Sequence, residues 1–387
     1  MLMGGLIPFL LHASLLAQDV QMVREGAYWV RTETGPVGMA PMRALKVTTR
    51  GHVIVRGSQN EQVVYKLVER VKARSADEAH LLFGSSITKT SSSNGMTSWM
   101  VAALAHESVI TQLDISVPRR LPGVILDVRP GDVEVYDLDG NVRVETSAGM
   151  IHGDRIRGSV DSRTGGGEIR MGKIGGAVRC ISEAGSIFVE NAGAEALCQT
   201  AGGEIQIHEA NGPLTLSTEG GNIQVDKAAG TVEAHTGEGV IEVFQAGGVV
   251  LADTRGGSIQ IGSAQGVKCQ SAAGAIRVKS GSGPLRLQTA MGSILAELLA
   301  GARVEDSSLV AGSGDITVLI PSNLALSVLA RNDTGGNPRI ISDFSELHAK
   351  TAAMRRQPLV FEGSINGGGP LLTLDTSGGI IYVRKLK

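Results

Sequence analysis

The fold is decided by two consecutive stretches of equal length, GEIQIHEANGPLTLSTEG at residues 203–220 and GNIQVDKAAGTVEAHTGE at residues 221–238. Each stretch starts with glycine and continues with isoleucine two residues later. Further on, each has a second aliphatic residue followed by a threonine. Apolar side chains that alternate with polar ones are typical of a strand with one buried face. Each stretch therefore predicts two short strands joined by turns.

The same unit recurs on both sides of these stretches. An aliphatic residue stands at every ninth position from Val142 to Ile259, except at Ala196. The two halves differ, so the true period is eighteen residues. One half places a hydroxyl four residues after its first aliphatic residue, at Thr146, Thr164, Ser182, Thr200, Thr218, Thr236 and Thr254. The unit resumes at Gly274 after a one-residue deletion and returns near the C-terminus at residues 372–383.

This repeat predicts an all-β protein, a parallel β-solenoid with 18-residue coils of two short strands. One unit cannot bury its apolar face alone, whereas coils stacked at about 4.8 Å pair every backbone group with the next coil. We expect glycine to supply corners with positive φ and the stacked hydroxyls to form a ladder. A thin interior also explains why aromatic residues make up only 3% of the chain.

The flanks divide the rest of the chain. Residues 1–17 are apolar up to Ala17 and are interpreted as a signal peptide. Residues 18–112 predict a β-rich N-terminal cap with one short helix capped by Ser75. The solenoid spans 113–320, and 321–387 holds irregular coils and the final repeat. We expect no transmembrane segment in the mature chain, because no later stretch has the ~18 apolar residues that a spanning helix needs.

Charge and cysteine content narrow the function. With 36 basic and 38 acidic residues the net charge is −2, which argues against a nucleic acid partner. Cys180, Cys198 and Cys269 form no metal-binding spacing and are expected inside the coils. Because Cys180 and Cys198 occupy the same position of adjacent coils, a disulfide bond between them is an alternative that the sequence leaves undecided. The turns also lack the recurrent aspartate of calcium-binding β-rolls.

No catalytic motif is found. The chain has no Gly-x-Ser-x-Gly elbow, phosphate-binding loop or His-Glu-x-x-His sequence, so we expect no catalytic residue, cofactor or metal. Glu190, His208 and Asp226 occupy one outward position of three successive coils. This ladder could serve acid–base chemistry or metal binding, or it could be an ordinary solvated face, which its mixed neighbours favour.

A second candidate binding surface is a group of basic residues near the N-terminus. Eight cationic side chains in residues 43–74 could contact anionic headgroups or nucleic acid, but alternation along strands favours a solvated face. They are Arg43, Lys46, Arg50, Arg56, Lys66, Arg70, Lys72 and Arg74.

Several short motifs, taken in order, resemble the bacterial adhesin-like β-strand-repeat proteins, which are related to auto-transporter adhesin head domains. They are SADEAHLL at 75–82, ISVP at 115–118, the Gly-x-Ile-x-Val units, DITVLIP at 315–321 and INGGG at 365–369. The resemblance covers nearly the whole mature chain. It implies export or association with the cell envelope, no established enzymatic activity and no functional residues to transfer.

We therefore expect an exported, non-enzymatic β-solenoid located in the periplasm, at the cell surface or outside the cell. Its expected partners are cell-envelope or surface components, polysaccharide or protein. Two alternatives stay open: a carbohydrate-active β-helix lyase or hydrolase that uses the Glu190, His208 and Asp226 face, and an envelope-stress accessory protein whose cap binds a membrane partner.

Overall fold

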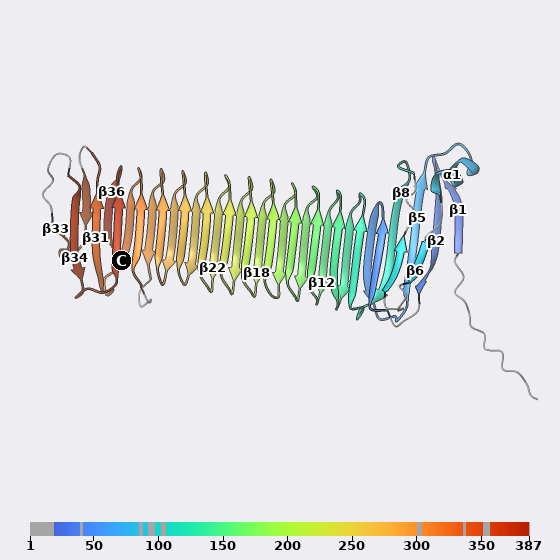
Figure 1. The fold of residues 1–387 in the computed structure, drawn as a ribbon, viewed down its shortest axis with the longest axis horizontal. Helices are drawn as coiled ribbons and strands as arrows, with labels where there is room; N and C mark the ends of the chain where they lie inside the picture. The colour runs from blue at the N-terminus through green and yellow to red at the C-terminus, as the bar shows by residue number, and fades with distance from the viewer. Residues whose placement is uncertain are drawn as a thin grey trace, which may run out of the picture.

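The structure is a computed structural model that describes residues 19–38, 42–84, 88–91, 97–101, 106–299, 304–335, 338–350 and 357–386. It is an all-β rod (Figure 1) whose repeats form a parallel β-solenoid of about 11 turns with coils of about 18 residues, which confirms the predicted fold class. The expected signal peptide lies outside the described residues. Within them, no helix has the length and apolar character needed to cross a bilayer.

Each regular coil contributes one strand to each of two sheets. In sheet A the coil strands are β10 (Val133–Leu138), β12 (Ile151–Ile156), β14 (Ile169–Ile174), β16 (Ile187–Ala192), β18 (Ile205–Ala210), β20 (Ile223–Ala228), β22 (Ile241–Ala246), β24 (Ile259–Ala264), β26 (Ile276–Gly281), β28 (Ile294–Leu298) and β30 (Ile316–Pro321). In sheet B they are β9 (Gly123–Val128), β11 (Asn141–Thr146), β13 (Val160–Thr164), β15 (Val178–Ser182), β17 (Ala196–Thr200), β19 (Leu214–Thr218), β21 (Val232–Thr236), β23 (Val250–Thr254), β25 (Val267–Ser271), β27 (Leu285–Thr289) and β29 (Ser307–Ala311).

The core lies between the two sheets and consists of stacked aliphatic columns. Ile205, Ile223 and Ile241 pair in register along sheet A, and all three are fully buried. Gln224, the neighbour of Ile223, is half-buried on the outer face. Full burial of one such isoleucine side chain stabilises the folded state by about 1.5–3 kcal/mol. The repeat therefore predicted correctly which side chains face inward.

The threonine column is held by backbone groups rather than by a chain of hydroxyls. The Thr218 hydroxyl donates to the carbonyl oxygen of Gly203 at 2.9 Å and accepts from the amide of Gly221 at 3.2 Å. The same two bonds recur at Thr164, Ser182, Thr200, Thr236, Thr254, Ser271, Thr289 and Thr376. Each hydroxyl thus joins two coils, which corrects the expected ladder.

The glycine that precedes each isoleucine is required by close stacking. The expectation of positive φ is wrong for most of this column: Gly149 has φ of 139°, but Gly203 and Gly221 do not fall in the positive range. A Cβ at Gly221 would instead collide with the carbonyl oxygen of Gly203 in the preceding coil. The coils approach so closely at this corner that a side chain has no room there.

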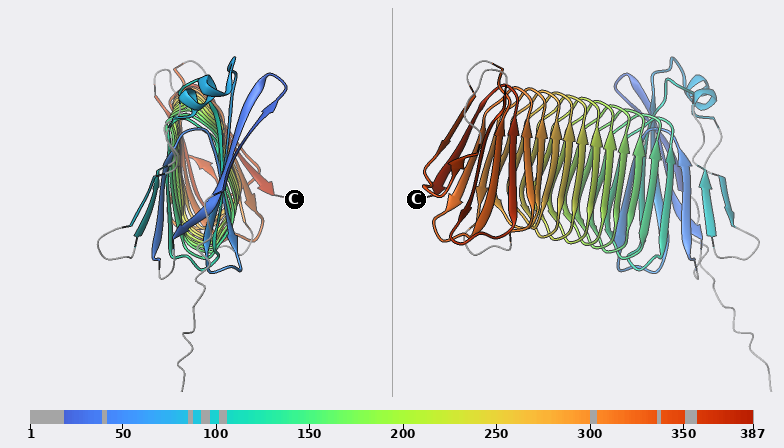
Figure 2. Two further views of the ribbon diagram at one scale, coloured as in Figure 1. Left: turned by 90° about the vertical axis from the view of Figure 1, so that its right-hand side faces the viewer. Right: turned by 60° about the vertical axis from the view of Figure 1, so that its left-hand side comes forward.

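At the N-terminal end the chain doubles back before the regular coils begin. The elements are β1 (Asp19–Glu25), β2 (Tyr28–Gly38), β3 (Ala44–Thr49), β4 (His52–Ser58), β5 (Val63–Val71), α1 (Ala76–Phe83), β6 (Thr88–Ser91), β7 (Thr97–Val101) and β8 (Ile110–Pro118). β3 lies between β7 and β9, and β4 lies between β8 and β10. β5, β2 and β1 then extend sheet A as antiparallel strands, and Figure 2 shows their hairpin crossing the end of the coils.

A buried ion pair fastens helix α1 to this end. Ser75 caps the helix as predicted, because its hydroxyl accepts a hydrogen bond from the amide of Glu78. At the other end, Arg31 donates to the carbonyl oxygen of Phe83 at 3.2 Å and to the Glu69 carboxylate at 2.7 Å. Burial raises the pKa of Glu69, and Arg31 opposes this rise.

The C-terminal end is also interleaved. It contains β31 (Leu326–Asn332), β32 (Arg339–Ser342), β33 (His348–Ala349), β34 (Leu359–Ile365), β35 (Leu371–Thr376) and β36 (Ile380–Leu386). The last two strands are inserted one coil inward: β35 pairs with β29 and β31, and β36 pairs with β30 and β32. The antiparallel strands β34 and β33 then cover the end of sheet B.

Candidate functional site

The predicted ladder of Glu190, His208 and Asp226 lies on the outer face of sheet A, in strands β16, β18 and β20. Glu190 and His208 are exposed, and Asp226 is half-buried. The structure joins two of the three residues: His208 Nδ1 lies 2.8 Å from Asp226 Oδ2. Among the described residues, no hydrogen bond or ion pair connects Glu190 with His208.

Asp226 is held as a carboxylate. Burial alone would raise its pKa, but hydrogen bonds from Gln224 and His208 outweigh this effect and lower it. Gln224 Nε2 donates to Asp226 Oδ1 at 2.9 Å. A carboxylate with both oxygens engaged is a poor general acid and is suited to orienting the imidazole.

The residues that directly follow Glu190, His208 and Asp226 form a second column on this face, and their contacts are those of an ordinary protein surface. Lys227 Nζ donates to Glu209 Oε1 at 2.7 Å, and Asn191 Nδ2 donates to Glu209 Oε2 at 3.3 Å. Within the described residues, no group of three or more His, Cys, Asp or Glu side chains is placed to hold a metal ion. Exposed pairs of this kind contribute little to stability.

A cluster that sequence analysis missed lies at the N-terminal end of the same face. His52 Nε2 is 3.1 Å from Glu134 Oε1, and the Tyr136 hydroxyl donates to Glu134 Oε2 at 2.7 Å. The same hydroxyl is 3.3 Å from His152 Nδ1. His52 belongs to the inserted strand β4, outside the repeat, so the eighteen-residue period could not place it beside Glu134.

The hydrogen bonds of this cluster determine the protonation states of Glu134 and Tyr136. Burial raises the pKa of Glu134, but the hydrogen bonds with Tyr136 and His52 and the electrostatic effect of His52 and His152 lower it overall. Burial and the same carboxylate raise the pKa of Tyr136 to about 12. Glu134 is therefore an acceptor and Tyr136 a donor at neutral pH. Arg56 and Arg155 lie over the tyrosine ring, each 5.8 Å from its centroid, which limits access to the cluster.

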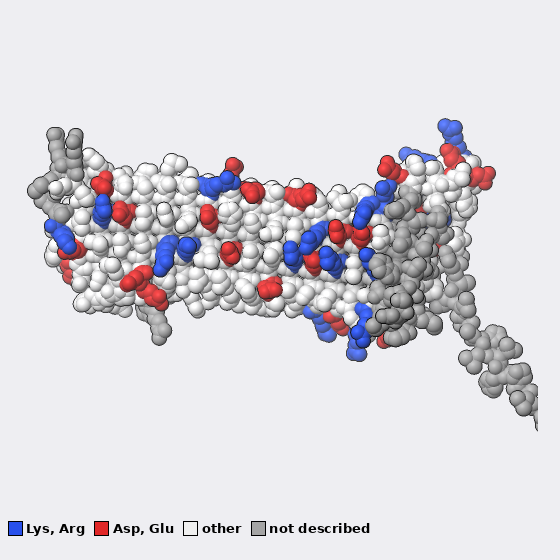
Figure 3. Space-filling model, in the orientation of Figure 1, with Lys and Arg blue, Asp and Glu red and all other residues white. Residues whose placement is uncertain are grey.

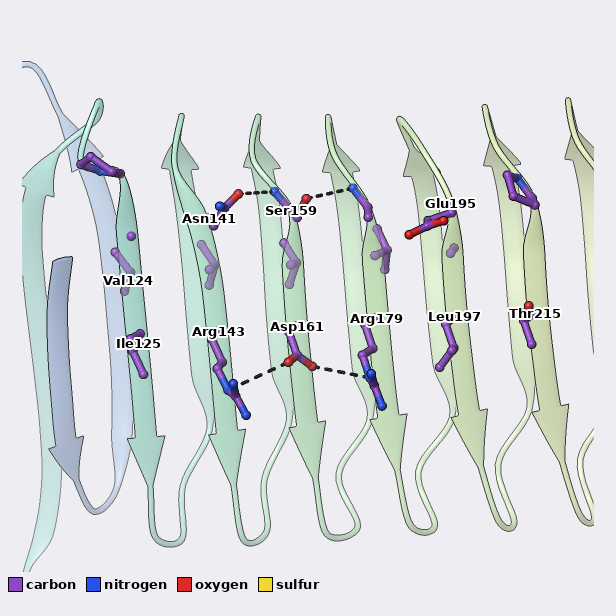
Figure 4. A pocket seen from close by; sticks show the side chains of 18 residues that line it. Val124, Ile125, Asn141, Arg143, Ser159, Asp161, Arg179, Glu195, Leu197 and Thr215 are labelled. Atoms are coloured by element: carbon purple, nitrogen blue, oxygen red, sulfur yellow. Dashed lines mark hydrogen bonds and ion pairs between the residues drawn. The ribbon is translucent and has the colours of Figure 1, made fainter. Parts of the chain in front are cut away.

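Sheet B carries a groove of about 670 Å³ that runs along the rod from β9 to β19 (Figure 4). Its wall is a column of outward side chains in neighbouring strands: Ile125, Arg143, Asp161, Arg179, Leu197 and Thr215. Asp161 lies between two arginines, 3.9 Å from Arg143 and 4.0 Å from Arg179. The column thus has three charged side chains in its middle, an apolar side chain on each side of them and Thr215 at its end.

The opposite wall of this groove is built by residues at or just before the start of each strand, and their side chains bind the backbone of the next coil. Asn141 Oδ1 accepts from the amide of Ser159 at 2.9 Å, and the Ser159 hydroxyl accepts from the amide of Ala177 at 3.2 Å. Figure 4 shows this row beside the Arg143, Asp161 and Arg179 row. Because both rows belong to paired strands and turns, the groove keeps a fixed width.

The predicted basic set does not form one patch. Lys46 belongs to β3 in sheet B, whereas Arg56 and Lys66 lie on β4 and β5 in sheet A. Arg50 donates to the carbonyl oxygen of Arg129, and Lys72 lies over the ring of Tyr28. Figure 3 shows both charges interspersed on the face that it presents, with a concentration toward the N-terminal half.

The cysteines lie inside the coils, as expected. Cys180 and Cys198 are register partners in β15 and β17, and both are buried free thiols. The hydrogen bond with Cys180 and then burial raise the pKa of Cys198. Cys269 is also buried and free. Free cysteine side chains that are buried in this way pack as small apolar side chains.

Comparison with known proteins gives two solved structures. One is a putative cell adhesion protein from Clostridium sporogenes, with 8% identity over 96% of this chain and 100% of that chain and a TM-score of 0.19. The other is a putative adhesin from Bacteroides fragilis, with 11% identity over 92% of this chain and 97% of that chain and a TM-score of 0.26. No family model matches the chain, and no curated protein matches it.

Proposed function

We propose that this protein is an exported, non-enzymatic β-solenoid that binds components of the cell envelope or cell surface along its outer faces. The groove on sheet B carries the proposal. It extends over strands β9 to β19, and its walls are side chains held in register by parallel pairing. A partner with an extended shape would meet the same spacing, about 4.8 Å, at every coil.

The groove is also suited to binding by its composition. Leu197 and Ile125 offer apolar contact, while Arg143 and Arg179 offer charge at defined places. Mixed grooves of this kind, with a few fixed polar groups, are typical of recognition surfaces. The proposed location, in the periplasm or at the cell surface, is tested by separating cell fractions and locating the protein with an antibody.

The binding proposal is tested with two substitutions in one outward column. Leu197→Arg places a long charged side chain inside the groove, and Leu251→Arg places the same side chain in the same column outside it. We expect the full chain to be retained on isolated envelope material, Leu197→Arg to lose retention, and Leu251→Arg to keep it. Retention that is equal in both variants contradicts the groove as the binding surface.

The enzyme alternative is favoured by one observation, the contact of 2.8 Å between His208 and Asp226. Histidine paired with a carboxylate can act as a general base. The test is release of reducing ends from acidic and neutral polysaccharides. We expect none above background. Turnover that disappears in Asp226→Asn would refute the non-enzymatic proposal.

A further inference from the structure

Two grooves meet at one edge of the rod, where sheet A turns into sheet B near the N-terminal end. One has a volume of about 420 Å³ and lies beside the loop at residues 58–61. The other has a volume of about 630 Å³ and continues over β12, β14, β16 and β18. Arg119 and Arg157 line both, so the two grooves form one track, which we call the corner track.

The corner track runs along the rod axis. The amide of Arg119 donates to the carbonyl oxygen of Ser58, and the amide of Asp139 donates to that of Arg119, so these residues stand on successive coils. Arg157 follows Asp139 by one coil, and Gly175 follows Arg157. Gly175 has no side chain, which leaves the track open beyond Arg157.

Cationic groups in the corner track keep unused hydrogen-bond donors. Arg119 and Arg157 share a single carboxylate, Asp139, at 3.2 Å and 3.5 Å. Each guanidinium has five N–H donors, so one shared carboxylate leaves most of them for another acceptor. Arg157 is also highly exposed, with 74% of its side chain accessible.

Two more cations in the corner track have no carboxylate partner. Arg120 lines the smaller groove and Lys173 the larger one. Across the part of the chain that the structure describes, no carboxylate lies within 4.0 Å of either side chain. Arg155, by contrast, is already paired with Asp137 and Asp154. Carboxylates also line the two grooves: Glu61 at the loop end, and Glu190 and Glu209 on β16 and β18, where Glu209 is paired with Lys227. Arg119, Arg120, Arg157 and Lys173 therefore form a basic segment in the middle of the corner track, on a protein with a net charge of −2.

The surroundings of the corner track favour an acidic polysaccharide over other polyanions. Binding of single-stranded nucleic acid uses aromatic platforms for base stacking, and the residues that line the track include no Phe, Tyr or Trp, with His208 at the far end as their one ring. Attachment to a membrane surface uses exposed apolar side chains, and the exposed large apolar residues of the described chain lie elsewhere. A linear chain with repeated anionic groups fits a track that is concave, parallel to the axis and supplied with cations over several coils.

We propose that the corner track binds an acidic polysaccharide through Arg119, Arg120, Arg157 and Lys173, which would contact its carboxylate or sulfate groups. This rests on the proposed function and names a ligand class for it. Guanidinium groups bind such oxyanions through paired N–H donors, and the ammonium group adds a point charge.

The test compares two double charge reversals in the full chain. Arg157→Glu with Lys173→Glu changes the corner track, and Lys268→Glu with Arg286→Glu is the matched control on the outer face of sheet B. Each pair changes the net charge equally at exposed positions. Binding is measured by calorimetry with polygalacturonate and dextran sulfate, which separate carboxylate from sulfate ligands, and with neutral dextran, single-stranded DNA and phosphatidylglycerol vesicles.

We expect salt-sensitive binding to polygalacturonate or dextran sulfate, no binding to neutral dextran, and weakening by about tenfold in the corner-track pair only. Equal weakening in the control pair would overturn the proposal, because it indicates general attraction between charges. Preference for DNA or vesicles, or no binding to either acidic polymer, would also overturn it. If retention on envelope material persists in that case, the proposed function stands without the corner track, and if it also fails, both are wrong.

Discussion

Single atoms decide how closely the coils can stack. A Cβ at Gly221 would lie against the carbonyl oxygen of Gly203, whereas a Cβ at the adjacent Gly220 would have no other atom within 4 Å. Two neighbouring glycines of one turn therefore have different reasons to be present. Gly221 is needed for packing, whereas Gly220 only fits a turn that other residues could form.

The first prediction uses this contrast. Gly221→Ala must push adjacent coils apart, so we expect it to lower the free energy of unfolding by about 1–3 kcal/mol, the usual cost of overpacking. Gly220→Ala should change it by less than about 0.5 kcal/mol. Chemical denaturation followed by circular dichroism measures both. Similar losses in the two variants would show that close stacking is not the reason for Gly221.

The second prediction concerns acid stability and Glu134. Its pKa in the folded protein is lowered by Tyr136 and His52, so ionised Glu134 stabilises the fold above the ordinary glutamate pKa of about 4.3. This contribution is lost as the pH falls below that value and through the lowered one. We expect the stability of Glu134→Gln to depend less on pH in this window than that of the native chain.

The control for this prediction is Glu242→Gln, in the same outward column of sheet A and several coils away. Glu242 takes part in no hydrogen-bonded cluster like that of Glu134 among the described residues, so this substitution should leave the acid dependence unchanged. An unchanged profile in Glu134→Gln would contradict the proposed hydrogen-bonded carboxylate.

At the scale of elements, the repeat was predictable and the ends were not. The period set the facing of Ile223, Gln224 and Cys180 correctly, because inward and outward positions alternate within every coil. The period also found the repeat at residues 372–383, but it could not place this coil. The alternation of apolar and polar residues does not say which coil lies next to which in space. The insertion of β35 between β29 and β31 could therefore be seen only in the structure.

In the candidate site, too, the repeat predicted some residue positions and could not predict others. Glu190, His208 and Asp226 were predicted to share an outward column, and they do, because they stand one period apart. The contact between His52 and Glu134 could not be predicted, since β4 is inserted from outside the repeat. Arg119, Arg157 and Asp139 meet at turns, where side-chain direction does not follow the alternation of strands.

The third prediction tests the interleaved end. Leu374 faces the core of β35 and is fully buried, and its neighbour Thr373 faces outward. Leu374→Asp should free β31 and β32, which depend on β35 and β36 for parallel pairing, and so remove their protection from hydrogen exchange. Thr373→Asp should keep it.

In both variants the central coils, β12 to β24, should stay protected, because each coil of a solenoid depends mainly on its neighbours. Loss of protection that is confined to β35 and β36, with β31 unaffected, would contradict the interleaved arrangement.

At the scale of the whole molecule, both proposed binding surfaces depend on coils that stack with a constant rise. Parallel pairing in register holds the outward columns in straight lines along the rod, and the groove on sheet B is a line of this kind. The corner track follows the turns of the same stacked coils. The interior supplies the rigidity, while turns and outward positions supply the chemistry. A molecule with slipped or missing coils would not keep either groove.

The most direct test measures the rise itself with pairs of spin labels in one outward column. Cysteines are introduced at Gln206 together with Arg277, Leu295 or Thr317, which lie four, five and six coils further along the column. The three native cysteines are buried and should stay unlabelled. Double electron–electron resonance should give label separations that grow by about 4.8 Å from each pair to the next. Separations that do not grow in equal steps, or that shrink along the series, would contradict the stacked-coil account.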